Sequence, residues 1–290
     1  MATAANPIRL LREAFALTHP IFNTLLLIFL PEFIVNLLFN LWMLAVVPVS
    51  RFQFPLLAWW DLHTALGSSA GALNLLQKIG IGLGLLGIYN LLVKPVVEAC
   101  ALLFLHTHQQ GQSFAFADVW DKIRRTYPDL VGTALLSLSV TIPIYLGLAL
   151  VSLGLAMLQI PFLFFLLLPL GWLAQTYLNL HLLFIRYPLL LEGDSALLSF
   201  IRGWEFTDQH FWRLLSAYLV ATTGVSVLAL IPGMVANPPA WTAPILQAPP
   251  LDIRWLRAIQ SILGSYVHLM SLPAITAYYL LVYGSLQDRD

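Results

Sequence analysis

Apolar residues fall in six long runs along this chain, and short polar or charged segments separate most of the runs. A helix needs about 20 mainly apolar residues to cross a bilayer, and each run reaches that length. Between the third and fourth runs, Pro161 disfavours one continuous helix, which indicates a tight hairpin. The pattern predicts six membrane-spanning helices, at residues 21–47, 79–105, 130–158, 161–185, 211–231 and 259–286.

The charged segment at residues 186–213 predicts an amphipathic helix between two spans. Apolar side chains recur there with the spacing of one helical face, and polar side chains occupy the opposite face. Gly193 breaks the chain before this helix, and Asp194 or Ser195 can cap its start. We expect the helix to lie on the membrane surface, after a turn at Glu192 and Gly193. The apolar positions are Leu197, Phe200, Ile201 and Trp204, and the polar ones are Ser199, Arg202 and Glu205.

This arrangement recurs along the chain. Residues 116–126 align with 197–207, and residues 8–20 give a weaker match. The pattern predicts a threefold repeat in which each unit is a surface helix followed by two spans. Chance similarity is the alternative, because any amphipathic helix that precedes a span looks alike. The predicted fold is an all-α polytopic membrane bundle of six transmembrane helices with three cytoplasmic amphipathic interfacial helices. It forms one transmembrane domain, with repeat units at about 7–106, 113–186 and 194–287.

Composition agrees with a membrane location, and charge sets the orientation. Apolar residues make up 59% of the chain and charged residues only 10%, whereas soluble domains carry roughly 25% charge. Nine Lys and Arg residues lie on one set of loops and four on the other, so both termini are expected in the cytoplasm. We expect membrane lipids around the chain, in a bacterial-type inner membrane or another internal membrane. The zero net charge disfavours a nucleic-acid partner.

Three ionisable residues lie inside predicted spans. Glu32 and Lys94 are each about 18 Å deep at the helical rise of ~1.5 Å per residue, and Glu98 lies one turn after Lys94. A charge at that depth costs at least ~2.5–3.5 kcal/mol, so each requires a partner. We predict an ionic cluster of Lys94 with Glu32, Glu98 or both, which Asn36 and Asn90 extend. The cluster is either a proton or substrate site or a buried pair that holds the first two spans together.

Other polar positions are weaker candidates. Gln175, His181 and His268 lie in later spans, where a lone histidine more often forms a hydrogen bond between helices than binds a ligand. His106 and His108 point to opposite sides of a helix, so we expect no metal there. The chain has no phosphate-binding loop in the right context and no soluble stretch long enough for a catalytic domain. We therefore expect no cofactor and no enzymatic activity.

Glycines at residues 80–87 match a dinucleotide-binding pattern only in their letters. The segment lies within a predicted span and no strand precedes it, so the structural context of that motif is missing. The spacing of Gly80 and Gly84 instead predicts close packing between two membrane helices.

Residues from Lys94-Pro95 to about Leu219 resemble a bacterial membrane family. The matching residues are Gly111-Gln112-Ser113, Glu192-Gly193, Ala196-Leu197 and Trp204, each at a junction between an amphipathic helix and a span. The family is named for the membrane domain of glycerophosphoryl diester phosphodiesterases and includes inner-membrane relatives. Its phosphodiesterase activity belongs to a separate soluble domain with histidine and acidic metal ligands. The resemblance therefore implies the membrane architecture and not the enzyme.

These observations favour a non-enzymatic integral membrane protein. Short loops and surface helices suit an assembly, organising or partner-binding component, whose partners would be lipids and another membrane protein or complex. The alternative is a small-solute or lipid-related transporter that uses the buried Glu/Lys cluster.

Overall fold

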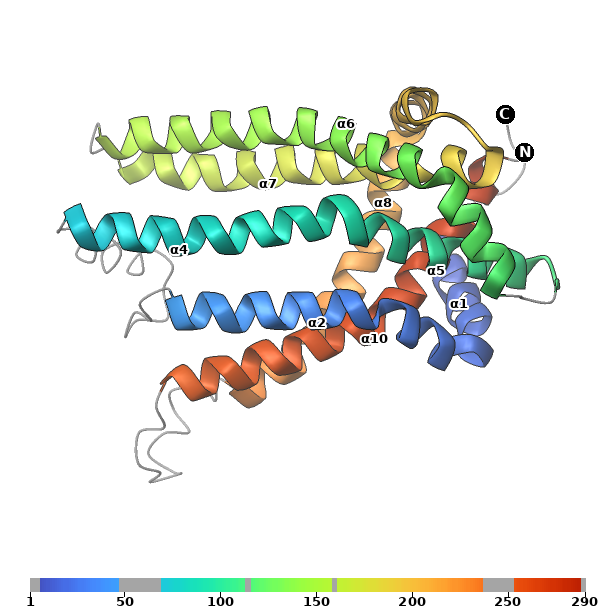
Figure 1. Cartoon of the computed structure of the whole chain (residues 1–290), viewed down its shortest axis with the longest axis horizontal. Coiled ribbons are helices and arrows are strands. Elements are labelled where there is room, and N and C mark those ends of the chain that lie inside the picture. Colours follow the sequence, from blue (N-terminus) through green and yellow to red (C-terminus); the bar gives the residue numbers. More distant parts are fainter. Residues whose placement is uncertain (1–5, 47–68, 113–115, 158–160, 237–252, 288–290) are drawn as a thin grey trace. The chain divides into compact units, whose positions relative to one another are not determined.

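The structure is a computed structural model that describes residues 6–46, 69–112, 116–157, 161–236 and 253–287. Throughout these residues the chain is helical and contains no strand, which confirms the predicted all-α class. Three short turns, η1 (His19–Ile21), η2 (Tyr89–Val93) and η3 (Pro188–Glu192), connect some of the helices, and η2 and η3 are π-helical. The helices are α1 (Pro7–Thr18), α2 (Phe22–Val46), α4 (Ser69–Ile88), α5 (Lys94–Gln109), α6 (Phe116–Met157), α7 (Pro161–Leu183), α8 (Ala196–Ala236) and α10 (Ile253–Gln287) (Figure 1).

Within the described residues, four helical stretches are long and apolar enough to cross a membrane. The chain is therefore a multi-pass membrane protein. The other two predicted spans, at 161–185 and 211–231, fall on α7 and α8. The turn predicted between the third and fourth spans includes residues outside the described part of the chain. The four stretches are Pro7–Met43, Gly80–Gln109, Phe116–Gly147 and Ser261–Gln287.

Two of the predicted surface helices are not separate elements. The residues expected on the membrane surface at 116–126 are the first turns of α6, which continues for 42 residues to Met157. Those at 197–207 likewise begin the 41-residue helix α8. Pro128 lies inside α6 without ending it, and the proline in α8, Pro232, follows its predicted span. Helical backbone is therefore continuous from the amphipathic segment into the span at both places.

The chain forms two compact units. Unit 1 comprises Met1–Leu17, Glu98–Val220 and Thr276–Asp290, and unit 2 comprises Thr18–Val97 and Ala221–Ile275. Helices α5, α8 and α10 each contribute residues to both units.

In unit 1, α6 and α7 lie side by side as an antiparallel pair (Figure 1). The core of unit 1 is formed by α5, the end of α7, η3, the start of α8 and the end of α10. Large side chains in this core are fully buried, and aromatic rings from three of these elements contact one another. The core includes Leu105, Leu180, Phe184, Leu190, Leu214 and Tyr278.

In unit 1, α8 turns a face of small and polar side chains towards the core. Ser199, Gly203 and Thr207 are buried at a spacing of four residues, whereas Leu197 and Ile201 are exposed. A Cβ atom on Gly203 would lie 2.6 Å from the Cα of Ile185, so the two backbones approach too closely for a larger side chain. Small and polar side chains allow such contact between membrane helices, and the apolar side chains then face outwards.

In unit 2, α2 and α4 pack side by side. Large apolar side chains on both helices are exposed, among them Leu27, Leu38 and Leu85, as expected for helices that face lipid. The predicted packing through Gly80 and Gly84 is wrong, because a Cβ atom on either would meet nothing within 4 Å. Gly82 makes the close contact instead, against the ring of Trp42.

Candidate functional site

The predicted cluster in unit 2 is centred on Glu32. This carboxylate lies on α2 with only 4% of its side chain exposed, and one oxygen is 3.7 Å from the Nζ of Lys94. The Nε2 of His268, on α10, lies 4.0 Å from the same oxygen. Three helices thus each bring one titratable side chain to one point. The structure joins Glu32 to Lys94, as the sequence allowed, and adds His268, which the sequence analysis placed apart.

Local sequence explains how Lys94 reaches this point. The chain before it forms the π-helical turn η2, in which the backbone N–H of Lys94 donates to the carbonyl of Tyr89, five residues earlier. Such a turn inserts an extra residue into a helix and rotates the side chains that follow it. Tyr89 itself is buried and lies within the electrostatic range of Glu32. π-Helical turns of this kind are frequent at functional sites.

Glu98 has a partner that is distant in the sequence. It belongs to unit 1, where it forms an ion pair with Arg186 in the segment between α7 and η3. The i, i+4 spacing placed Glu98 near Lys94 along one helix, but the spacing could not include Arg186, which is far away in the sequence.

The predicted amides have different surroundings. Asn36 and Asn90 are half-buried, each one turn from Glu32 or Lys94 on its own helix. Gln175 is exposed on α7, so it does not share a buried face with His181.

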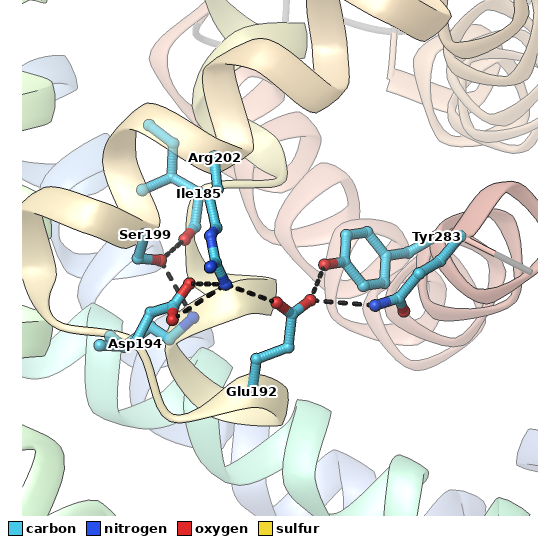
Figure 2. Close-up of polar contacts among 8 residues, drawn as sticks. Ile185, Glu192, Asp194, Ser199, Arg202 and Tyr283 are labelled. Carbon is cyan, nitrogen blue, oxygen red and sulfur yellow. Dashed lines mark hydrogen bonds and ion pairs between the residues drawn. The ribbon is translucent and has the colours of Figure 1, made fainter. Parts of the chain in front are cut away.

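A second polar cluster, which was not predicted from the sequence, lies in unit 1. Figure 2 shows Arg202 between the carboxylates of Glu192 and Asp194, at 3.2 and 2.9 Å. On the far side of Glu192, the hydroxyl of Tyr283 donates at 2.6 Å, and the side-chain amide of Gln287 donates at 3.1 Å. We call these five residues the Glu192 network. It ties η3 and the start of α8 to the end of α10.

Backbone contacts around Ser199 reinforce the same junction. The Ser199 hydroxyl donates to the carbonyl of Ile185 and accepts from the backbone N–H of Leu189 (Figure 2). Gly193 adopts φ of +80°, a left-handed conformation that favours glycine, which agrees with the predicted turn. Burial raises the pKa of Tyr187 beyond its usual range, so this phenol stays neutral beside the charged residues. The spacing of four between Ser199, Gly203 and Thr207 is the sequence signal that predicts this face.

His181 is fully buried in unit 1 between α7 and α8. Its Nδ1 lies 2.9 Å from the carbonyl oxygen of Tyr177, and its Nε2 lies 2.9 Å from a carboxylate oxygen of Asp208. Both partner atoms are oxygens that can accept a hydrogen bond from the ring. Trp204 packs at 4.4 Å between ring centroids. The predicted role of His181 as a contact between helices therefore agrees with its surroundings.

The Glu192 network and the Glu32 cluster differ in the distances between their charged groups. The described residues contain no group of three or more His, Cys, Asp or Glu side chains arranged to hold a metal ion. The Glu192 network pairs its charges with short contacts, whereas the Glu32 cluster places a carboxylate beside two nitrogen bases at longer distances.

Comparisons with family models, with curated proteins and with solved structures find no match to this chain. The resemblance to the phosphodiesterase membrane-domain family therefore stays a prediction.

Proposed function

We propose that the protein is a non-enzymatic integral membrane protein that acts as an assembly, organising or partner-binding component. It would cross a bacterial-type inner membrane six times, with both termini in the cytoplasm and lipids around it. The excess of Lys and Arg on one set of loops supports this orientation. The order of elements is compatible with the proposed threefold repeat, because α1, α6 and α8 each begin with a polar segment that leads into spans.

The observation that carries this proposal is the exposed apolar face of α8. This helix faces the core of unit 1 through Ser199, Gly203 and Thr207, whereas Leu197 and Ile201 are exposed. Trp212, on the same helix, is also largely exposed. An apolar face on a helix whose interior contacts are already made is suited to lipid or to another membrane protein.

Site-specific photo-crosslinking tests the partner. A photoreactive residue at Ile201 is expected to capture a defined protein in intact membranes, and one at Glu205, a charged position on the same helix, is expected to capture much less. Mass spectrometry identifies the adducts, and the two purified proteins should then re-form the complex. Adducts with lipid alone at Ile201 would remove the partner-binding proposal.

A second candidate function is transport of a small solute or lipid-related molecule through unit 2. The specific observation in its favour is the buried Glu32 with Lys94 and His268 from two other helices. Ionisable residues within membrane spans often mark substrate pathways and proton relays. Flux measurements on proteoliposomes test it: Glu32→Gln is expected to abolish uptake, and Glu205→Gln is expected to leave it unchanged. Equal flux in both variants would argue against transport through this cluster.

A further inference from the structure

We infer that Glu32 is a proton-binding site within the membrane, with His268 as the group that exchanges the proton and Lys94 as the counter-charge. The inference deepens the second of the two proposed functions, because it identifies the coupling ion. It rests on the placement of the three side chains and on their unequal exposure.

Because Glu32 is buried, its ionised form needs to be stabilised by its surroundings. A carboxylate in an apolar interior is stable only with a compensating charge or a proton. Lys94 supplies such a charge, but its Nζ lies 3.7 Å away, which is longer than a charge-assisted hydrogen bond of about 2.7–2.9 Å. Protonation of the carboxylate is an alternative way to stabilise it.

The side chains of Lys94 and His268 determine which cation the site binds. Hard metal cations require several oxygen ligands in a shell around them. Beside Glu32, the ammonium of Lys94 would repel a metal ion, and the imidazole of His268 offers nitrogen. A proton needs only one acceptor oxygen, and the site supplies one. The site thus favours a proton over Na⁺ or a divalent cation.

His268 is suited to deliver this proton. Its side chain is 46% exposed, whereas that of Glu32 is almost covered. A movement of about 1 Å would bring Nε2 within hydrogen-bond distance of the Glu32 oxygen. Histidine gains and loses protons near neutral pH, so it can pass one on. The step is balanced: the imidazolium loses the proton, the carboxylate becomes a carboxylic acid, and the site gains one positive charge when the imidazole is protonated again.

Other titratable groups lie on the elements around Glu32. Tyr89, from η2, is buried within electrostatic range. Glu98 lies one turn after Lys94 on α5, and α4 and α10 carry Lys78 and Tyr266. Neither the rest of α2 nor the α8 residues of unit 2 contain any titratable side chain, as the sequence shows.

Infrared difference spectroscopy on the purified full chain tests the inference directly. Stepping from about pH 9 to about pH 4 brackets the ordinary titration of glutamate near 4.3. We expect a band from a poorly hydrated carboxylic acid in the wild type, loss of that band in Glu32→Gln, and retention in Glu205→Gln. Superimposable difference spectra of the wild type and Glu32→Gln would overturn the inference.

Two further variants keep the test decisive if Glu32→Gln does not fold. In Lys94→Met the band is expected to form at a higher pH, because the cation that stabilises the carboxylate is gone. In His268→Gln the band is expected to form more slowly after a pH jump. An unchanged band in both variants would contradict the assigned roles.

Flux in proteoliposomes then separates this inference from the transport proposal. A Glu32 band without solute flux would remove the transport proposal and leave the proton-binding site. If Glu32→Gln kept both the solute flux and the infrared band of the wild type, Glu32 would be neither the proton-binding site nor part of transport.

Discussion

Glu192 in unit 1 and Glu32 in unit 2 are two carboxylates with opposite surroundings. Glu192 is partly exposed and receives hydrogen bonds from Tyr283 and Gln287, at 2.6 and 3.1 Å, as well as an ion pair with Arg202. Glu32 is buried, and its distances to Lys94 and His268 are 3.7 and 4.0 Å. The partly exposed carboxylate is thus held by hydrogen bonds, and the buried one lies beside two titratable nitrogen groups.

The difference indicates separate roles for the two charges. Hydrogen bonds to Glu192 at 2.6 and 3.1 Å fix the geometry of the junction. Glu32 is buried beside Lys94 and His268, so its ionised form requires a compensating charge, and a proton is the alternative. Backbone packing also varies along the chain, because Gly203 in unit 1 and Gly82 in unit 2 are in close contact whereas Gly84 in unit 2 is not.

The largest effect is expected from Lys94→Met. The variant leaves the Glu32 carboxylate buried without this cation, and breaking a buried pair costs about 3–5 kcal/mol. Protonation of Glu32 removes the uncompensated charge, so the loss should shrink as the pH falls. Thermal unfolding in mild detergent at several pH values measures it. A loss that does not vary with pH would show that Glu32 does not take up a proton in the folded variant.

A smaller loss is expected from Gly203→Ala. The new Cβ would meet the Ile185 backbone at 2.6 Å, so main-chain atoms must move, at about 1–3 kcal/mol. The matched control is Gly84→Ala in unit 2, where the Cβ meets nothing and alanine favours the helix by roughly 0.5–1 kcal/mol. Equal midpoints of thermal unfolding in the two variants would contradict the difference in packing between the units.

Tyr283→Phe tests the donors to Glu192. Loss of the 2.6 Å hydrogen bond to a carboxylate is expected to cost about 1.5 kcal/mol. The control is Tyr278→Phe, because the Tyr278 hydroxyl is buried without a hydrogen-bond partner in the described residues, so its removal should be neutral or stabilising. Unfolding in a denaturing detergent measures the stability of both variants. If they were equally stable, the Glu192 network would not stabilise unit 1.

Much of the fold is readable from sequence because lipid imposes a simple requirement. Backbone polar groups inside a bilayer must be satisfied within the segment, so a long apolar run predicts a helix. The runs at 21–47 and 79–105 are helical over nearly all of their described residues. Which residues of α8 face the core of unit 1 was not predicted, because the rule that apolar side chains point inwards holds for water and not for lipid. Ser199, Gly203 and Thr207 form the inward face instead.

The candidate sites can be predicted from the sequence only where a charged residue falls within an apolar run, because burying a charge is costly. Glu32 and Lys94 stand out because each is a charge within an apolar run. The pairing of Glu98 with Arg186 was missed, since Arg186 becomes a neighbour only through the fold. The Glu192 network was missed for the same reason, because Tyr283 and Gln287 are distant in sequence from Glu192 and carry no local signal.

The smallest effect is expected at the exposed side of the Glu192 network. Arg202 has 49% of its side chain exposed, so water and salt screen its pairs with Glu192 and Asp194. Arg202→Gln should cost only ~0.2–1 kcal/mol at low salt, and less at about 1 M salt. A double-mutant cycle with Glu192→Gln isolates the pair from other changes. A coupling energy that is large and insensitive to salt would mean that Arg202 is shielded from water in the membrane-bound protein, and Glu192 would then be as strongly dependent on its cation as Glu32 is on Lys94.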